Sequence, residues 1–427
     1  MRKTTQAIHT PPVPPENAQY RKSVLDNGLR VVSETIPHVR SVSIGLWANV
    51  GSRDEDPTRN GISHFLEHMV FKGTKNRSVK EIAQSLESLG GYLNAFTTKE
   101  QTCFYARVLD EHAETAMDVL ADLLLNATFR KEELEKEKLV VIEELKNAED
   151  DPEDIIHDYF EKAIFPRHSL GFPIIGTEGN LRRFQREDLR AHVANHYSPE
   201  HMVLAAAGSI DHERLRKLAQ RYFRTLKPNV GPPKRQAGPT RPAKATFQEI
   251  SRPIQQAHVC LGTTAYSIRH RDRYSLLLLN ALLGEGMSSR LYQRIREKHG
   301  MAYSVYSYVT MLSDTGIFAA YLGTDKKNIA NALELVHLEL EKLKRRPVSK
   351  AELERTKAQI KGTLMLGLEN MSSRMIRLGG GELYLETYVP LDAILKKIEE
   401  VTGESMQRVA NDVFNESLFS TVIIRPA

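Results

Sequence analysis

The sequence GISHFLEHMVFKGT, residues 61–74, has two histidines and a glutamate in the order His-x-x-Glu-His. On a helix of about 3.6 residues per turn, His64 and His68 lie one turn apart on one face, so both imidazoles can bind one zinc ion. Glu67 then lies beside the metal without binding it, where its carboxylate can take a proton from an activated water. This stretch therefore predicts a helical metal site with its own base.

The motif needs support from elsewhere in the chain, because this composition gives roughly 0.07 matches to His-x-x-acid-His by chance. A structural zinc site has a fourth protein ligand, usually Cys, whereas a catalytic site has three ligands and leaves a position for water. The chain has only two cysteines, Cys103 and Cys260, and neither is near the motif. We therefore expect a third ligand, a carboxylate or His, from another element.

The best candidate for that ligand is Glu144, in the charged segment RKEELEKEKLVVIEELKNA, residues 130–148. Glu144 follows Glu137 by seven residues, so the two acids share a helix face, with Val140 and Val141 between them. Apolar residues beside the acids favour an inward face. The alternative is a surface helix whose Glu and Lys residues are simply solvated.

The pair of segments HFLEHMVFKGT and VVIEELKNAEDDP resembles the pitrilysin (M16, inverzincin) family of zinc metallopeptidases, in a bacterial branch similar to the mitochondrial processing peptidase β subunit. The resemblance extends from about residue 25 to residue 424. In the family the second Glu of the VVIEE run is the third zinc ligand, which falls on Glu144, and an acid seven residues earlier, here Glu137, assists catalysis. The resemblance implies one zinc ion per chain and an endopeptidase that acts on peptides or presequence-like segments.

A second part of the site is implied by the segment SRLYQRIREKHGMAYSVYSY, residues 289–308. Taken alone, Arg296 would be a solvated residue of a basic helix and Tyr303 a core residue opening a strand. The family has a substrate-binding Arg and Tyr with this spacing in the corresponding domain. The resemblance therefore implies that both residues hydrogen-bond the substrate and stabilise developing negative charge.

Substrate is expected to add as a strand along residues 91–98, main chain to main chain, with Asn94 and Ala95 at the contact as in the family. Phe71 has two interpretations: it lines the pocket after the cleaved bond, or it packs in the core as aromatic residues after a helix usually do.

The chain divides at a linker, residues 227–245, which contains five prolines and no periodicity. We expect a mobile N-terminal arm at 1–19, a zinc-binding catalytic domain at 20–226 and a second domain at 246–427. The second domain repeats the first, since Val-Ala-Asn at Val193 recurs at Val409 before a turn and an apolar strand.

The repeat places a copy of the zinc helix at residues 273–283, which contain no His and no Glu, so only the first domain is expected to bind metal. The predicted fold class is α/β (α+β): two duplicated domains, each a mostly antiparallel sheet with helices packed on one face. The resemblance implies this fold more strongly than the periodicity does.

Three histidines compete with the motif for the metal, because His192 and His196 have i, i+4 spacing and His201 is near. No acid follows them at a catalytic position, and the second domain has Asp412 and Val413 at the same turn, which favours an architectural role.

Two glycine segments also admit a functional interpretation. Gly284-Glu285-Gly286 could be a phosphate loop, but it follows helical sequence and lacks a suitably placed Lys, so a loop between helices is favoured. The run 379–381 is either a hinge or a helix end, and the sequence does not decide between them.

Composition excludes several classes of protein. The net charge is only +5, and no Lys/Arg run is interleaved with aromatic residues, so we expect no nucleic-acid partner. No apolar run approaches the roughly 18 residues of a membrane span, and the N-terminus has no apolar signal core, so a soluble cytoplasmic protein is expected. The two cysteines are embedded in apolar sequence and are predicted to be buried thiols.

Two other functions stay open at this point: a non-catalytic partner or core subunit of the same family, and a peptide-binding member that does not cut. Large single-chain relatives enclose substrate in a chamber of four domains, whereas this chain has two. The resemblance therefore implies a homodimer in which Arg296 and Tyr303 of one protomer complete the zinc site of the other.

Overall fold

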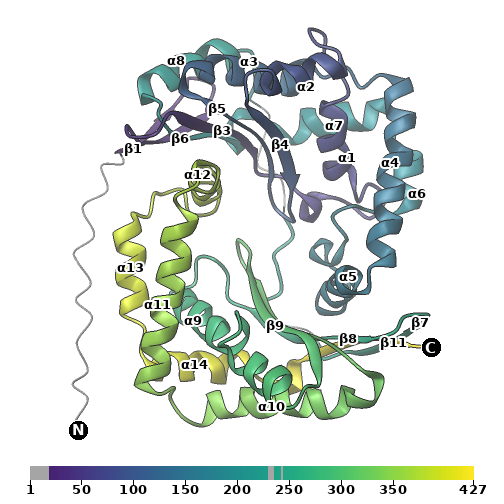
Figure 1. Cartoon of the computed structure of the whole chain (residues 1–427). Helices are drawn as coiled ribbons and strands as arrows, with labels where there is room; N and C mark the ends of the chain where they lie inside the picture. The colour runs from purple at the N-terminus through teal and green to yellow at the C-terminus, as the bar shows by residue number, and fades with distance from the viewer. Residues whose placement is uncertain (1–18, 229–234, 242–243) are drawn as a thin grey trace.

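The computed structural model of the chain describes residues 19–228, 235–241 and 244–427 (Figure 1). The expected N-terminal arm lies outside the described residues except for Gln19. Residues 229–234 and 242–243 of the expected linker also lie outside them. The expected domain boundaries stay a prediction, although the described strands form two separate sheets.

The first sheet has six strands in the order β1-β2-β6-β3-β5-β4, and all neighbours are antiparallel except β2 and β6. Its strands are β1 (Gln19–Val24), β2 (Arg30–Thr35), β3 (Ser41–Ala48), β4 (Tyr92–Thr97), β5 (Thr102–Leu109) and β6 (Met202–Gly208). Strands β4 and β5 form a hairpin joined by residues 98–101. Because β4 is at the edge of this sheet, one side of its backbone is open to a further strand.

The second sheet has five strands in the order β7-β11-β8-β10-β9, with β7 and β11 as the parallel pair. Its strands are β7 (Phe247–Arg252), β8 (Ala257–Ala265), β9 (Ala302–Met311), β10 (Gly316–Thr324) and β11 (Ser420–Pro426). This order repeats β2-β6-β3-β5-β4 of the first sheet, including the position of the parallel pair. The topology supports the internal repeat predicted from the sequence.

The first half contains both helices expected from the sequence, the one with His64 and His68 and the one with Glu144. They are α1 (Ile62–Val70), α2 (Val79–Glu87), α3 (Ala113–Asn126), α4 (Lys131–Asp150), α5 (Pro152–Ile164), α6 (Glu178–Arg183), α7 (Arg186–His196) and α8 (His212–Phe223). Ser78 and Glu81 form a capping box at the start of α2, each accepting a hydrogen bond from the other's backbone N–H. Buried residues of α1 and α3, including Phe65 and Leu120, pack in the core beside the first sheet.

The second half has the helices α9 (Arg273–Gly284), α10 (Ile329–Arg345), α11 (Lys350–Gly367), α12 (Met371–Leu385), α13 (Leu391–Glu399) and α14 (Gly403–Val413). Helix α9 is the predicted copy of the zinc helix, and leucines fill its buried surface in place of metal ligands. The segment Tyr292–Lys298 forms a π-helix, a rare conformation that is frequent at functional sites. The predicted fold class is confirmed.

Each half also sends one helix to the other half's sheet (Figure 1). Helix α5 of the first half packs on β8 and β11, where Ile156 and Phe160 join the core of the second sheet. Helix α12 of the second half packs on β6, β3 and β2, where Met375 lies against Trp47. The two sheets are therefore covered on a second face by an exchanged helix, a tertiary feature that the sequence periodicity did not show.

Several smaller predictions are also decided by the structure. Cys103 and Cys260 are free and buried, as predicted. Gly284 ends α9 and Glu285 is its C-cap residue, so the segment follows a helix and the phosphate-loop alternative loses its basis. The glycine run 379–381 lies inside α12, so it is not a helix end. Within the described part of the chain, no helix is long and apolar enough to cross a membrane.

Candidate metal centre

Helix α1 is held in place by a buried glutamate at its N-terminus. Gly61, with a φ of 98°, precedes the helix in a left-handed conformation that favours glycine. Glu55 accepts hydrogen bonds from the backbone N–H groups of Gly61, at 2.7 Å, and Ser63, at 2.8 Å. These contacts satisfy N–H groups that a helix start leaves unpaired. They also fix the first turn, to which His64 belongs.

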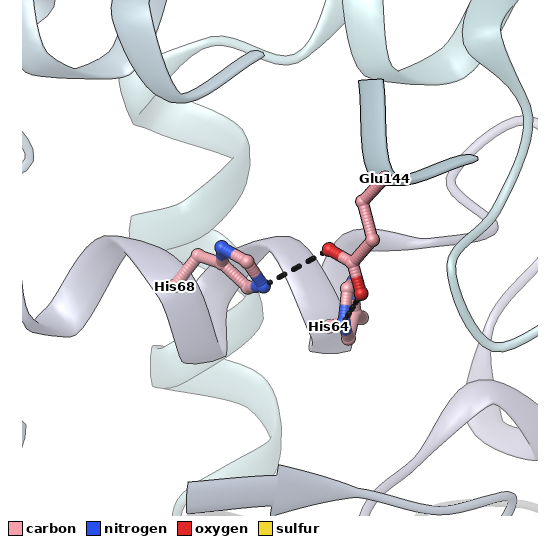
Figure 2. A group of neighbouring side chains, drawn as sticks. All are labelled: His64, His68 and Glu144. Atoms are coloured by element: carbon pink, nitrogen blue, oxygen red, sulfur yellow. Dashed lines mark ion pairs between the residues drawn. The ribbon is translucent and has the colours of Figure 1, made fainter. Parts of the chain in front are cut away.

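His64, His68 and Glu144 converge on one point between α1 and α4 (Figure 2). The distance from His64 Nε2 to Glu144 Oε1 is 3.7 Å, and that from His68 Nε2 to Glu144 Oε2 is 3.5 Å. Tetrahedral zinc with bonds of about 2.1 Å holds its ligand atoms roughly 3.4 Å apart. The two His–Glu distances are close to this value, and all three ligand atoms lie within 4.8 Å of one another. The His₂Glu donor set is that of a zinc ion with one open position.

Only part of the α4 face that was expected to point inward is buried. Val141 is buried, but Val140 is 52% exposed, so the expectation of two inward valines is wrong for Val140. Glu144 lies at the edge of this face, with its side chain 47% exposed. The surface-helix alternative describes the other side of α4, where Glu143 and Lys146 form an exposed ion pair.

Glu137 is buried directly behind His68. Nδ1–H of His68 donates to Glu137 Oε1 at 2.9 Å, and Lys72 Nζ lies 2.8 Å from the other oxygen. Burial raises the pKa of Glu137, but the contacts with His68 and Lys72 outweigh it and hold the pKa below its usual value. A carboxylate that accepts from Nδ1 leaves Nε2 of His68 free to bind a metal.

The two histidines differ in their electrostatic surroundings. Burial, with a smaller contribution from His68, lowers the pKa of His64 to about 4, so His64 is neutral near pH 7. Burial also lowers the pKa of His68, but the Glu137 hydrogen bond and nearby carboxylates outweigh it and raise the net pKa. Nδ1 of His64 is buried and makes no hydrogen bond within the described residues. Neutral His64 is in the form that a metal requires.

Glu67 is hydrogen-bonded to the edge strand rather than to the metal-binding cluster. Thr97 of β4 donates its hydroxyl proton to Glu67 Oε2 at 2.6 Å. Burial raises the pKa of Glu67, and the Thr97 hydrogen bond opposes this shift. A carboxylate with a raised pKa, next to a three-ligand site, is suited to accept a proton.

The competing histidines do not form a second site. His192 Nε2 lies 3.2 Å from Ser63 Oγ, beneath the first turn of α1, and its ring is 4.6 Å from that of His196. Across residues 19–228, 235–241 and 244–427, His64, His68 and Glu144 form the only group of three potential ligands that meets at one point. The architectural interpretation of His192 is therefore favoured.

Arg296 and Tyr303 contact each other in the second half. Arg296 donates to the backbone oxygen of Tyr303 at 2.8 Å, and its guanidinium lies 4.8 Å from the Tyr303 ring centroid and 4.9 Å from that of Tyr292. The Tyr303 side chain is prominent on the surface, since the residue is 75% exposed. In the described part of the chain, neither residue has a hydrogen bond or ion pair with the metal-binding cluster.

The expected substrate strand is β4. Asn94 donates from its side chain to the Tyr92 hydroxyl at 2.6 Å and accepts from the Ala95 backbone N–H at 2.9 Å. Phe71, next to α1, is half-buried against the first core, which agrees with the core interpretation. Residues 96–99 form part of the wall of a cavity of about 720 Å³, whose other walls include α12 and the end of β9. The C-terminal end of β4 therefore borders this cavity.

The comparisons with known proteins agree with this site. Residues 30–178 match the family described as Insulinase (Peptidase family M16), and residues 183–360 match the one described as Peptidase M16 inactive domain. An uncharacterized zinc protease of Bacillus subtilis strain 168 is 42% identical over 95% of this chain and 98% of its own length. One of Streptomyces coelicolor is 38% identical over 94% of this chain and 89% of its own length.

Solved structures show the same fold. A crystal structure of a protease from Helicobacter pylori has a TM-score of 0.89 and 25% identity, covering 96% of this chain and 100% of that one. A peptidase M16 inactive domain from Pseudomonas fluorescens also reaches 0.89, at 21% identity, covering 96% of this chain and 98% of that one. The chain has the fold of this class of peptidase, and His64, His68 and Glu144 form a possible metal site in it. It belongs to peptidase family M16, and the finer likeness to the mitochondrial processing peptidase β subunit stays a prediction.

Sequence reasoning missed several residues around the centre. Lys72 follows His68 by one helical turn, so its position beside Glu137 could have been noticed. Glu55 and Thr97 had no such signal, because their contacts with α1 depend on how a loop and a strand pack against it.

Proposed function

We propose that this chain is a zinc-dependent endopeptidase that hydrolyses peptides or presequence-like segments. The observation that supports it most is the convergence of His64, His68 and Glu144 within 4.8 Å of one another, with Glu67 beside them. These three residues would hold one zinc ion. Bound zinc would supply Lewis-acid polarisation of the scissile carbonyl and of an attacking water.

Glu67 acts as the general base in this proposal. It accepts a proton from the attacking water and then passes the proton to the leaving amine. The Thr97 hydroxyl orients one carboxylate oxygen of Glu67, and Glu137 keeps Nε2 of His68 aimed at the metal position. Both supporting contacts are already formed in the free chain.

The substrate binds along the free edge of β4, where main-chain pairing accepts many sequences. Asn94 and Ala95 lie at this edge, and the cavity beyond Thr97 has room for apolar side chains. Arg296 and Tyr303 hydrogen-bond the carbonyl region of the substrate and stabilise negative charge as it develops. Phe71 contributes through packing or by lining the pocket after the cleaved bond.

A second candidate is a non-catalytic subunit of the same family. It is favoured by one finding, since residues 183–360 match a domain described as inactive. That match covers mostly the second half, which has no His-x-x-Glu-His motif, while the complete ligand set lies in the first half. Peptidase activity is therefore the function that the site supports better, ahead of peptide capture without cleavage.

The test is a library of quenched fluorescent peptides incubated with the full chain. We expect cleavage that stops when zinc is removed with a chelator and returns when zinc is added back. A zinc-loaded chain that cleaves no peptide in the library, yet binds peptides stably, would favour the non-catalytic alternatives.

A further inference from the structure

An ion network centred on the buried Arg53 joins the two halves of the molecule, and the Asp314 side chain at its outer end is 39% exposed. Arg53, in the 3-10 turn Ser52–Asp54, donates from both terminal nitrogens to the two carboxylate oxygens of Asp314, each at 2.7 Å. The same guanidinium lies 2.5 Å from Glu100, and both Arg53 and Glu100 are buried. Asp314 belongs to the turn between β9 and β10. A bidentate arginine–carboxylate contact fixes the orientation of the two side chains as well as their distance.

The network also includes the hairpin turn of the proposed substrate strand. Glu100 lies in the β4–β5 turn and accepts from the backbone N–H of Ser313 at 2.9 Å and from its hydroxyl at 2.6 Å. Arg235, from the described part of the expected linker, donates to Asp54 at 2.6 and 2.9 Å. Four segments that are distant in the sequence therefore meet around one arginine.

One route leads from this network to the metal-binding helix. Glu55 follows Arg53 by two residues, and its carboxylate caps α1 through the N–H groups of Gly61 and Ser63. His64 is the next residue after Ser63. Displacement of the Arg53 loop would therefore change the first turn of α1, and with it the position of one zinc ligand.

A second route leads to the proposed base. The backbone N–H of Arg53 donates to the Lys99 oxygen at 2.7 Å, and that of Ser52 donates to the Thr98 oxygen at 3.3 Å. These residues directly follow Thr97, which donates to Glu67. The same loop thus supports both the metal ligand and the base.

We propose that Asp314 is a positioning residue for the metal centre. Through Arg53, the second half holds the loop that fixes both α1 and the end of β4. This inference rests on the proposed zinc site. It gives the second half of the chain, whose helix α9 has no metal ligands, a role in positioning the ligands of the first half.

The test is the substitution Asp314→Asn, which keeps the shape of the side chain and removes its charge. Loss of a residue that hydrogen-bonds a metal ligand directly weakens metal binding by about 10–100-fold, and because Asp314 acts indirectly through Arg53 and Glu55, about tenfold is the upper bound expected here. We expect the zinc dissociation constant, measured by competition with a chromophoric chelator, to rise accordingly and to recover in Asp314→Glu. Asp325→Asn, at the other end of β10, is the matched control and should bind zinc as the wild type does.

Zinc affinity is measured without any peptide turnover, so this test and the test of peptidase activity can fail separately. The double variant Asp314→Asn, Glu55→Gln then tests the route from Arg53 through Glu55 to α1. If both residues act through this route, their effects on the zinc dissociation constant should be non-additive. An unchanged zinc dissociation constant in Asp314→Asn, or additive effects in the double variant, would overturn the proposal even if thermal stability fell. If Asp314→Asn does not fold, Ser313→Ala is the second variant, because it removes only the hydrogen bond from the Ser313 hydroxyl to Glu100. This variant should also raise the zinc dissociation constant.

Discussion

At the scale of single residues, the ligand role of Glu144 can be separated from a general effect of charge on α4. Glu144→Gln should lower zinc affinity on the order of a hundredfold or more, because a neutral amide is a poor substitute for a carboxylate ligand. Glu143→Gln is the matched control, since Glu143 is an exposed neighbour paired with Lys146. Metal analysis after dialysis measures the result, and equal zinc retention by both variants would exclude Glu144 as a ligand.

His192 should make the fold sensitive to acid. Burial is the main cause that lowers the pKa of His192 to about 3, so this residue stays neutral in the folded chain. The unfolded chain binds a proton below its ordinary pKa of about 6.5, so the stability contribution is present above that pH and is lost as pH falls toward 3. From pH 7 to pH 5 we expect the free energy of unfolding to fall by about 2 kcal/mol from this residue alone.

The comparison with His192→Gln isolates that contribution from those of the other histidines. Urea unfolding at both pH values should show a smaller loss of stability in the variant than in the wild type. The same loss in both proteins would contradict the assigned protonation state of His192.

At the scale of elements, α12 packs closely against the first sheet at Gly379. A Cβ atom on Gly379 would lie 2.2 Å from Trp47 Nε1, whereas one on Gly381 would meet no atom within 4 Å. Gly379→Ala should therefore destabilise the fold by about 1–3 kcal/mol through overpacking. Gly381→Ala should stabilise it by about 0.5–1 kcal/mol, because alanine favours a helix interior.

Both glycines lie in the same helix, so helix propensity is matched and the contact with Trp47 is the difference between the two variants. Thermal or urea unfolding measures the two free energies. If Gly379→Ala were as stable as Gly381→Ala, the packing of α12 on the first sheet would be wrong.

The elements also show what the sequence could predict. Helix α1 was predicted because its signal, the spacing of His64, Glu67 and His68, lies within a few residues of the chain. The inward face of α4 was only partly predicted, since the exposure of Val140 depends on what packs beside it. The exchange of α5 and α12 could not be predicted, because an apolar helix face does not specify which sheet it will cover.

The candidate site divides in the same way. His64, Glu67 and His68 follow from local spacing, and Glu144 and Glu137 were implied by family resemblance. The support from Glu55, Thr97 and Arg53 is tertiary: a loop, a strand and a distant turn meet only in the folded chain. Apart from Glu137, the residues that orient the candidate ligands were therefore harder to predict than the ligands themselves.

At the scale of the whole molecule, we propose that two chains form a homodimer with composite sites. Arg296 and Tyr303 contact each other within the second half, with the Tyr303 ring exposed, and this is compatible with their acting on the zinc site of a partner chain. The test mixes His68→Ala with Tyr303→Phe protein under conditions that exchange subunits. Each variant alone should be nearly inactive.

If sites are completed between chains, a mixed dimer has one doubly damaged site and one intact site, so activity returns. If each site is completed within one chain, every site keeps a lesion and activity stays low. Mixed dimers confirmed by mass spectrometry that recover no activity would exclude composite sites while leaving the zinc centre itself unaffected.

The central claim is that Glu67 is a base beside a zinc ion held by His64, His68 and Glu144. The most direct measurement is the zinc content and peptide hydrolysis of Glu67→Gln, side by side with the wild type. We predict the same zinc content and a fall in kcat on the order of 10²–10⁴-fold, because the amide cannot accept the proton. Wild-type hydrolysis by zinc-loaded Glu67→Gln, or loss of its zinc while Glu144→Gln keeps both zinc and activity, would contradict the account.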